Sequence, residues 1–339
     1  MEFGKGSLED LGMTMMWKDR RVLVTGATGL VGSWLVKRLI QEEAFVVTLI
    51  RDWNPQSELI RSGDVQKTTV ISGELEDFGT IERAISENEI DTVFHLGAQP
   101  LVGMAFRSPL PTFEANIRGS YNVLEACRIH AGLVKRIVIA SSDKAYGDID
   151  VLPYTEDMIP NGRFPYDVSK SCTDLLARSY GETYDLPVTI ARCGNIYGGG
   201  DLNWSRIVPG TIRSLLFHER PIIRSDGKLT RDYIFVLDVV EAYLHLAIKT
   251  PDEGIRHEAF NFSGEKPWDV LSITQKIQEN MDCEHLKPKI LNQSKAEIKD
   301  QYLDSGKAKR LLSWKSQYTI EEGLEQTIHW YKNFLAKCS

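Results

Sequence analysis

The sequence has few cysteines, and they form no pattern of disulfides or metal ligands. Five cysteines are spread over 339 residues, and no Cys-x-x-Cys pair occurs among Cys127, Cys172, Cys193, Cys283 and Cys338. An odd number of widely spaced cysteines is typical of reduced thiols in a cytoplasmic protein, not of a disulfide framework or a zinc site. No cluster of His, Cys and Asp has the spacing of metal ligands, so we expect no bound metal.

The sequence also lacks long apolar runs and an excess of positive charge. No apolar stretch approaches the roughly 18 residues that a membrane-spanning helix needs. The segment from Met1 to Lys5 contains no apolar core of a signal peptide. Because the net charge is −7, the chain gains nothing from the field of a nucleic acid or an anionic membrane. We therefore expect neither as a partner, and we expect residues 1–15 to be a loose N-terminal extension.

The chain does contain a regular alternation of short β-branched runs and longer helical patterns. This alternation predicts parallel βαβ units, that is, a doubly wound Rossmann-type α/β sheet with helices on both faces. The expected strands are 21–25, 45–51, 69–72, 92–96, 136–141 and 188–192, and the expected helices are 31–43, 79–88, 113–131 and 166–184. After Cys193 the pattern changes. We expect residues 193–339 to form mainly a smaller lobe, with a strand near 257–263 returning to the main sheet.

A glycine motif directly follows the first expected strand. Gly26-x-x-Gly29-x-x-Gly32 comes after the apolar run Val22-Leu23-Val24. The first glycine permits the tight turn, the second lets the backbone approach a pyrophosphate, and the third lets helix and strand pack closely. A purely structural turn is the alternative, but the strand before and the helix after favour a dinucleotide. We therefore interpret 16–192 as an NAD(P)-binding domain whose turn residues are Gly26, Thr28, Gly29, Leu30, Val31 and Gly32.

The residue at the end of the second strand usually distinguishes NAD from NADP. Arg51 and Asp52 stand 19 and 20 residues beyond Gly32. An aspartate accepts a hydrogen bond from the ribose 2′-hydroxyl, whereas an arginine pairs with a 2′-phosphate. Arg51 stands where the acid normally lies, which favours NADP+ over NAD+. Alternatively, Arg51 is a solvated charge and Asp52 binds the ribose. Glu74 and Leu75 are expected to line the adenine pocket or to form a plain loop.

A second motif carries the expected chemistry. Tyr166 and Lys170 are four residues apart on an expected helix, so they share one face. A free phenol titrates near 10, and a neighbouring ammonium together with a positive nicotinamide ring lowers that pKa. Tyr166 is then a candidate general base for a sugar hydroxyl, with Ser142 sharing a hydrogen bond to the same hydroxyl. Tyr-x-x-x-Lys also arises by chance on helices, but here it follows a strand that ends in Ser141-Ser142.

Longer strings give a resemblance to a known family. From about Met16 to Leu335 the sequence resembles the extended short-chain dehydrogenases/reductases, specifically their nucleotide-sugar epimerase/dehydratase group, and within it the CDP-glucose 4,6-dehydratases. The strings that carry the resemblance are Gly32-Ser33-Trp34-Leu35, the run from Phe94 to Val102, Ser142-Asp143-Lys144, the run from Arg192 to Asp201, and Lys307-Ala308-Lys309…Trp314.

The resemblance implies an NAD(P)+-dependent enzyme that converts a nucleotide-diphosphate hexose, CDP-glucose above others, into its 4-keto-6-deoxy derivative. Tyr166 would deprotonate the C4 hydroxyl while a hydride leaves C4, water would leave across C5 and C6, and the hydride would return to C6. The cofactor is thus regenerated in each turnover. Asp143 would protonate the departing hydroxyl, and Lys144 would stabilise the enolate or handle the C5 proton.

Two other interpretations remain open. In 4-epimerases of the same fold, the positions of Asp143 and Lys144 are usually small or neutral, and Asp143-Lys144 could instead be a loop pair exposed to water. The string Arg231-Asp232-Tyr233 departs from the CDP-glucose enzymes and is more like the epimerases. A dinucleotide-binding regulator without catalysis is the remaining alternative, against which the intact Ser142, Tyr166 and Lys170 argue.

The resemblance also implies further contacts. Leu96 and Ala98 would contact the cofactor, and Gln99, Asn195, Arg206 and Arg231 the substrate, although Arg206 and Arg231 could be surface residues. The guanidinium fork of an arginine matches phosphate oxygens. The helix 113–129 and the helix of Tyr166 would pair across the interface of a homodimer or higher oligomer. From periodicity alone, simple core packing explains the apolar positions of that helix equally well.

Overall fold

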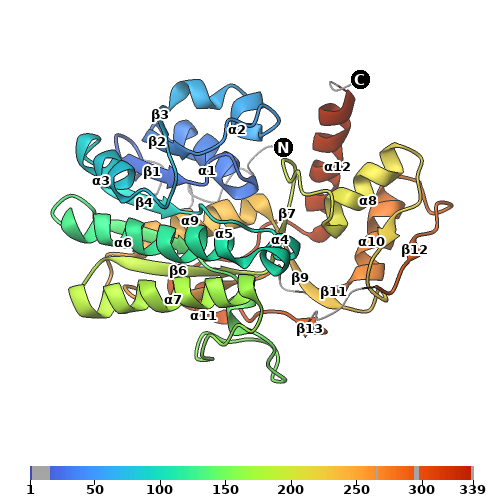
Figure 1. Ribbon diagram of the computed structural model, residues 1–339. Coiled ribbons are helices and arrows are strands. Elements are labelled where there is room, and N and C mark those ends of the chain that lie inside the picture. Colours follow the sequence, from blue (N-terminus) through green and yellow to red (C-terminus); the bar gives the residue numbers. More distant parts are fainter. Residues whose placement is uncertain (2–15, 265, 294–297, 337–339) are drawn as a thin grey trace.

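The computed structural model describes residues 1, 16–264, 266–293 and 298–336, so the expected extension 1–15 lies outside the described residues except for Met1. The centre of the molecule is a parallel sheet of seven strands in the order β10-β6-β5-β4-β1-β2-β3 (Figure 1). This confirms the predicted Rossmann-type fold. The strands are β1 (Arg21–Thr25), β2 (Phe45–Ile50), β3 (Thr69–Ser72), β4 (Thr92–His95), β5 (Arg136–Ala140), β6 (Val188–Cys193) and β10 (Ala259–Phe262).

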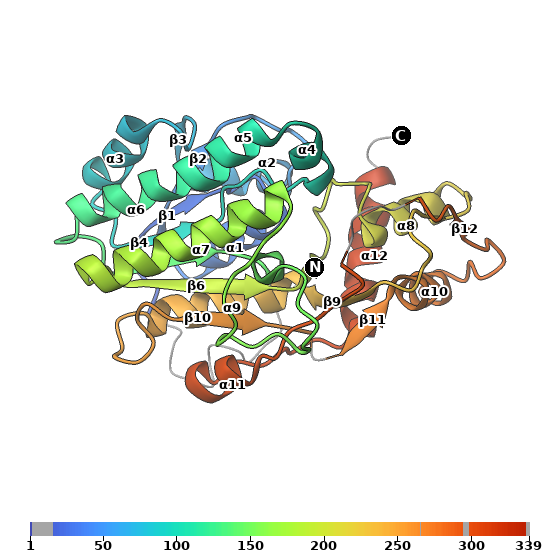
Figure 2. The same ribbon diagram turned by 60° about the horizontal axis from the view of Figure 1, so that its bottom comes forward.

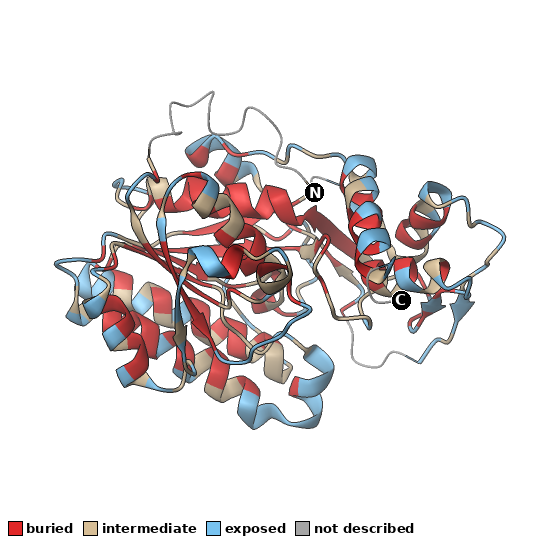
Figure 3. Ribbon diagram, turned by 90° about the horizontal axis from the view of Figure 1, so that it is seen from above, coloured by how far each residue is buried: buried red, intermediate tan, exposed pale blue. Residues whose placement is uncertain are grey.

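Helices cover both faces of this sheet (Figure 2). The first face carries α1 (Leu30–Gln41), α2 (Glu58–Arg61) and α9 (Val236–Lys249), and the second carries α3 (Phe78–Glu87), α6 (Gly119–Ile129) and α7 (Pro165–Tyr184). Each face has its own apolar core, one around Trp34 and Val240 and the other around Ile81 and Val123. Buried residues accordingly concentrate on the sheet and on the inner sides of the helices (Figure 3).

The order of the strands determines where ligands can bind. Successive strands are added toward one edge of the sheet from β1 to β3 and toward the other edge from β4 onward, so the strand order reverses between β1 and β4. The paired ends of these two parallel strands are Thr25 and His95. In open α/β sheets, ligands bind beyond the carboxyl ends of the strands at this switch point. The glycine motif begins directly after Thr25, so the fold places it at the expected edge.

The expected helix 113–131 is interrupted in the structure. It consists of α5 (Pro109–Phe113), a π-helical turn (Glu114–Arg118) and α6. The wider turn lets the amide of Asn116 bond in two directions: it accepts from the backbone N–H of Gln99 at 2.7 Å and donates to Ser169 Oγ at 2.9 Å. Such π-bulges are frequent at functional sites, and this one ties the loop after β4 to α7.

The smaller lobe is built around one central strand. β9 (Thr230–Phe235) pairs with β7 (Asn195–Tyr197), β11 (Pro267–Asp269) and β13 (Asp300–Gln301). The lobe lies beside the main sheet in both views (Figures 1 and 2). Its other elements are α8 (Ile207–Leu216), β8 (Ile222–Ile223), α10 (Val270–Asn280), β12 (Lys289–Ile290) and α12 (Ile320–Ala336). Two short helices pack on the main domain: α4 (Val102–Arg107) against α5 and α7, and α11 (Gly306–Leu312) against β10 and α9. Among the helices of the described ranges, none has both the length and the apolar character required to cross a membrane.

Candidate active site

The glycine turn is a backbone cradle that excludes side chains. Gly26 has φ +70°, and a Cβ there would lie 2.7 Å from the backbone nitrogen of Gly97. A Cβ on Gly32 would lie 2.2 Å from the carbonyl oxygen of Gly26. Gly29 is the N-cap of α1, and no side chain caps this helix. The first N–H groups of α1 therefore stay open for an anion such as a pyrophosphate, which is what a dinucleotide requires.

Other predicted cofactor residues lie around this turn. Thr28 is part of the turn, and Leu30 and Val31 open α1. Gly97, between Leu96 and Ala98, donates its backbone N–H to Thr25 Oγ1 at 3.0 Å. A Cβ on Gly97 would lie 2.8 Å from the side chain of Leu75, so Leu75 borders the same edge of the sheet. Glu74 is exposed, and no described contact joins it to the turn.

Arg51 and Asp52 turn toward each other. Arg51 Nε donates to Asp52 Oδ2 at 2.7 Å, and both side chains are largely exposed. No described contact joins either side chain to the glycine turn. The structure therefore gives no support to the predicted preference for NADP+.

The structure fixes α7 against the end of β5. Lys170 Nζ donates to the carbonyl of Ala140 at 2.7 Å, two residues before Ser142. Burial lowers the pKa of Lys170 to about 8. Tyr166, one turn earlier on α7, is partly exposed and lies close enough to the Ser142 hydroxyl to form a hydrogen bond with it. The structure thus brings the three predicted residues Ser142, Tyr166 and Lys170 to one place.

The expected lowering of the phenol pKa is not what the protein alone produces. The pKa of Tyr166 is raised, first because the surrounding protein shields the phenol group from water although the side chain is partly exposed, and second because the carboxylate of Asp143 is near. The Arg206 guanidinium and the hydrogen bond with Ser142 act in the opposite direction. The spacing to Lys170 reveals neither the burial nor the carboxylate. The expected lowering of the pKa included a positive nicotinamide ring, and it stays a prediction for the protein with its cofactor bound.

Asp143 and Lys144 are not a loop pair exposed to water, so that alternative was wrong. Asp143 is 1% exposed and accepts a hydrogen bond from Ser142 Oγ at 2.8 Å. Lys144 lines a cavity, with its Nζ 3.5 Å from Asp143 Oδ2. Gln301 from β13 bonds to Lys144 Nζ and donates to the Asp143 carbonyl at 3.1 Å. No local pattern in the sequence indicated Gln301, because only the packing of the small lobe brings it here.

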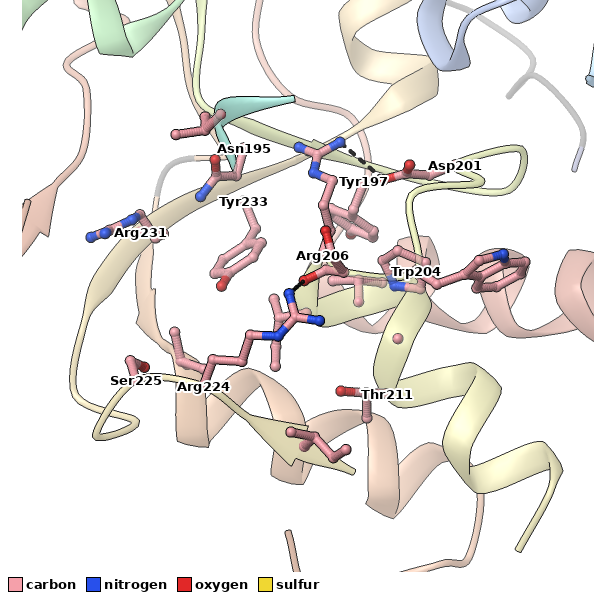
Figure 4. A pocket seen from close by; sticks show the side chains of 18 of the residues that line it. Asn195, Tyr197, Asp201, Trp204, Arg206, Thr211, Arg224, Ser225, Arg231 and Tyr233 are labelled. Carbon is pink, nitrogen blue, oxygen red and sulfur yellow. Dashed lines mark hydrogen bonds and ion pairs between the residues drawn. The ribbon is translucent and has the colours of Figure 1, made fainter. Parts of the chain in front are cut away.

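The cavity, of about 690 Å³, lies between the carboxyl ends of β5 and β6 and the small lobe (Figure 4). A volume of this size suits a ligand as large as a nucleotide sugar. Three of the four predicted substrate residues line it, namely Asn195, Arg206 and Arg231. Arg231 is 8% exposed, so it is not a surface residue, and its guanidinium donates to the carbonyls of Thr230, Ile298 and Lys299.

Arg206 is held at the cavity by a braced loop. Arg206 Nη1 donates to Asp201 Oδ2 at 2.9 Å. The loop itself is fixed from two sides, because the Tyr331 hydroxyl donates to the carbonyl of Asp201 at 2.6 Å and Trp34 Nε1 donates to the carbonyl of Gly199 at 2.8 Å. An arginine oriented in this way presents its remaining N–H groups to phosphate oxygens.

Gln99 is not among the residues that line this cavity. Its amide donates to Thr112 Oγ1 at 3.3 Å and accepts from the backbone N–H of Leu101 at 2.5 Å. Asp167, by contrast, lines the cavity and is 3% exposed, yet it was not among the predicted site residues. Its place next to Tyr166 was the only signal, and an acid in the first turn of a helix has a structural explanation as well. In the part of the chain that the structure describes, no group of His, Cys, Asp and Glu could hold a metal.

Comparison with known proteins agrees with this geometry. Residues 23–327 match the family model described as GDP-mannose 4,6 dehydratase. The chain is 28% identical to a CDP-glucose 4,6-dehydratase of Salmonella typhimurium over 340 residues, covering 94% of this chain and 92% of that protein.

Solved structures give the same picture. A UDP-glucose 4-epimerase from Thermotoga maritima superposes with a TM-score of 0.84 and 29% identity, covering 93% of this chain and 99% of that one. A dTDP-glucose 4,6-dehydratase from Streptomyces venezuelae, solved with NAD bound, has a TM-score of 0.83 and 25% identity, covering 92% and 97%. The chain therefore belongs to the GDP-mannose 4,6-dehydratase family and is an enzyme of the extended short-chain dehydrogenase/reductase superfamily.

Proposed function

We propose that the protein is a nucleotide-sugar 4,6-dehydratase, with CDP-glucose as the favoured substrate. The observation that carries the proposal is the position of Lys144, which lines the cavity with its Nζ 3.5 Å from the buried carboxylate of Asp143. The same carboxylate lies near the phenol of Tyr166. Oxidation at C4 alone does not need this pair, whereas removal of water across C5 and C6 needs both a base and an acid. The Salmonella typhimurium relative, named as a CDP-glucose 4,6-dehydratase, supports the choice of base and sugar.

The residues present fit a nicotinamide dinucleotide. The glycine cradle leaves no room for a Cβ at Gly26 or Gly32, and the open N-terminus of α1 faces the same edge. When bound, the cofactor would accept a hydride from C4 of the sugar and later return it to C6. A positive ring next to Tyr166 would oppose the effect of burial and of Asp143 on the phenol pKa.

The side chains of the protein then have separate roles in binding and in proton transfer. Tyr166 takes the proton of the C4 hydroxyl, and Ser142 orients that hydroxyl through a shared hydrogen bond. Lys170 fixes α7 against the end of β5 through its hydrogen bond to Ala140. Arg206, oriented by Asp201, binds the diphosphate. The cavity wall contributed by the small lobe supports the proposed division into a cofactor domain (16–192) and a substrate lobe (193–339).

A second candidate is a 4-epimerase of the same family. It is favoured by the solved Thermotoga maritima relative, a UDP-glucose 4-epimerase with 29% identity, and by the string Arg231-Asp232-Tyr233. The two candidates share C4 oxidation and differ in the fate of the 4-keto sugar. An epimerase returns the hydride to the opposite face of C4, while a dehydratase loses water before the hydride returns.

One experiment separates these functions. The protein is incubated with CDP-, GDP-, UDP- and dTDP-hexoses, and the products are analysed by mass spectrometry and NMR. A dehydratase gives a product lighter by one water, with the largest rate for CDP-glucose. A product of unchanged mass with inverted configuration at C4 would show that the protein is an epimerase. If no sugar gives a product, the dinucleotide-binding regulator without catalysis is the remaining function. The Tyr166→Phe variant is the control, and it should form neither product.

We also propose a homodimer that pairs α6 and α7 of two copies. These two helices pack side by side on the outer face of the sheet (Figure 2). Their outward side chains include Tyr121, Leu175 and Tyr184, which are 38%, 50% and 55% exposed. Large apolar groups on one face favour a covered interface. Light scattering should give twice the mass of one chain for the wild type and the mass of one chain for Leu175→Glu. A monomeric wild type would overturn this part.

A further inference from the structure

Two carboxyl groups lie near Lys144, and they face different surroundings. Asp143 is buried beneath the cavity wall, its Oδ1 is engaged by Ser142, and it is not among the residues that line the cavity. Asp167 lies on the wall itself, together with Lys144 and Asn195. Asp167 and Lys144 thus share one wall of the cavity, where a base and an acid can reach the same bound sugar.

We propose that Asp167 is the base that removes the C5 proton and that the Lys144 ammonium is the acid for the departing C6 hydroxyl. The proposal rests on the dehydratase function proposed above. It moves the acid role from Asp143 to Lys144 and leaves Asp143 as a positioning residue that orients Ser142 and Lys144.

The surroundings of both groups suit these roles. Burial raises the pKa of Asp167 to about 6, while Lys144 acts in the opposite direction. A carboxylate with this pKa is largely ionised at neutral pH yet holds a proton better than an exposed one, as a general base requires. Burial lowers the pKa of Lys144, which makes its ammonium a better acid. Gln301, its partner from β13, is neutral and does not compete for the proton.

Asp167 also has a structural role at the start of α7, but that role does not explain its position on the cavity wall. It is the third residue of α7, and a backbone hydrogen bond from Phe164 reaches its carboxyl group, as in the capping of a helix. Capping alone is served equally well by an exposed carboxylate. It does not require a side chain that is 3% exposed on the wall of a cavity and electrostatically coupled to Lys144.

The proposed step balances. The C5–H bond breaks and its proton goes to the Asp167 carboxylate, while its electron pair forms the C5=C6 double bond. The C6–O bond breaks, and the oxygen leaves as water with a proton from Lys144. When hydride from the nicotinamide dinucleotide reaches C6, Asp167 returns its proton to C5. The proton that Tyr166 took from the C4 hydroxyl then passes to Lys144 and restores its ammonium.

The test compares Asp167→Asn with wild type on the nucleotide hexose that the wild type converts, in heavy water. C4 oxidation is followed by the near-ultraviolet absorbance of the reduced cofactor, and elimination by loss of water and by deuterium at C5. We expect Asp167→Asn to reduce the cofactor normally, to eliminate water roughly 100-fold or more slowly, and to lose C5 exchange. Lys144→Met should retain C5 exchange but stop water loss.

Two further variants control for the loss of a carboxylate elsewhere and for the positioning role of Asp143. Asp157→Asn changes an exposed carboxylate in the segment before α7 and should behave as wild type. Asp143→Asn should slow C4 oxidation and elimination together, because it acts through Ser142. The proposal is overturned if Asp167→Asn eliminates water at the wild-type rate with deuterium at C5, or if Asp143→Asn alone blocks elimination selectively. A wild type that inverts C4 without losing water would overturn both this proposal and the proposed function.

Discussion

Lys170 Nζ donates a 2.7 Å hydrogen bond to the carbonyl of Ala140, which joins the helix of the candidate base to the strand that leads to Ser142. Both partners are fixed by regular structure, one by α7 and the other by β5. The relative position of Tyr166 and Ser142 is therefore determined by the sheet and not by a loop. This is the arrangement expected of a site whose reacting groups must be held in place before the substrate arrives.

Gly32→Ala is expected to abolish dinucleotide binding. A methyl group there would lie 2.2 Å from the carbonyl oxygen of Gly26, and since the obstacle is backbone, the turn must open. Titration of NAD+ followed by calorimetry should show no binding. Gly132→Ala, where nothing lies within 4 Å of the added carbon, is the matched control. Undiminished NAD+ binding by Gly32→Ala would place the cofactor elsewhere.

Water elimination should depend on pH through Asp167. Its carboxylate is the active form, and its pKa is about 6, so the rate should fall as the pH drops through about 6. The charged groups that face it are Lys144 and Asp143, which shift the limb but do not reverse its sign. A pH profile of kcat for wild type should show this acid limb, and the residual activity of Asp167→Asn should lack it. An unchanged limb in the variant would assign it to another group.

Asp201→Asn should weaken substrate binding more than catalysis. Asp201 orients Arg206 at the cavity through a 2.9 Å contact. Asp201 is buried, but Arg206 is partly exposed, so solvent still screens the pair, which is worth about 1 kcal/mol. We expect KM for the nucleotide sugar to rise roughly five-fold, with kcat little changed. Steady-state kinetics over a range of substrate concentrations measures both. A fall in kcat at constant KM would mean that Arg206 does not bind the ground state.

Asp174→Ala should destabilise the fold strongly. Asp174 and Arg192 are fully buried and joined by two hydrogen bonds of 2.7 Å, so the variant leaves an unpaired buried guanidinium. Breaking such a pair costs about 3–5 kcal/mol, which urea unfolding would detect. Asp185→Asn removes the charge from the exposed pair with Arg256, keeps a residue type that tolerates the φ of +51° at this position, and should cost about 1 kcal/mol or less. Equal losses in the two variants would contradict the role of burial.

Much of the fold could be predicted because its signals are local. Each expected strand of the first half reappears within one residue of its predicted ends, since β-branched runs bounded by turns define parallel strands. The π-helical turn at 114–118 could not be predicted, because its stabilising contacts come from Gln99 and Ser169, far away in the chain.

Part of the candidate site could likewise be predicted from local motifs, and part of it could not. The glycine turn and the Tyr166–Lys170 spacing are readable from the chain, because each is a short motif on one element. Gln301 and the burial of Asp143 are tertiary facts, produced when the small lobe packs against the end of β5. The direction in which the chain alone shifts the pKa of Tyr166 could not be predicted for the same reason, since it depends on neighbours that the spacing does not reveal.

The bond from Trp34 to the carbonyl of Gly199 has a consequence for how the two ligands communicate. Trp34 belongs to α1, at whose first turn we propose that the dinucleotide phosphates bind, and Gly199 belongs to the loop that orients Arg206 through Asp201. One helix thus contacts both proposed ligand sites. We therefore expect a displacement of α1 on cofactor binding to alter the position of Arg206, so that each ligand changes the affinity for the other.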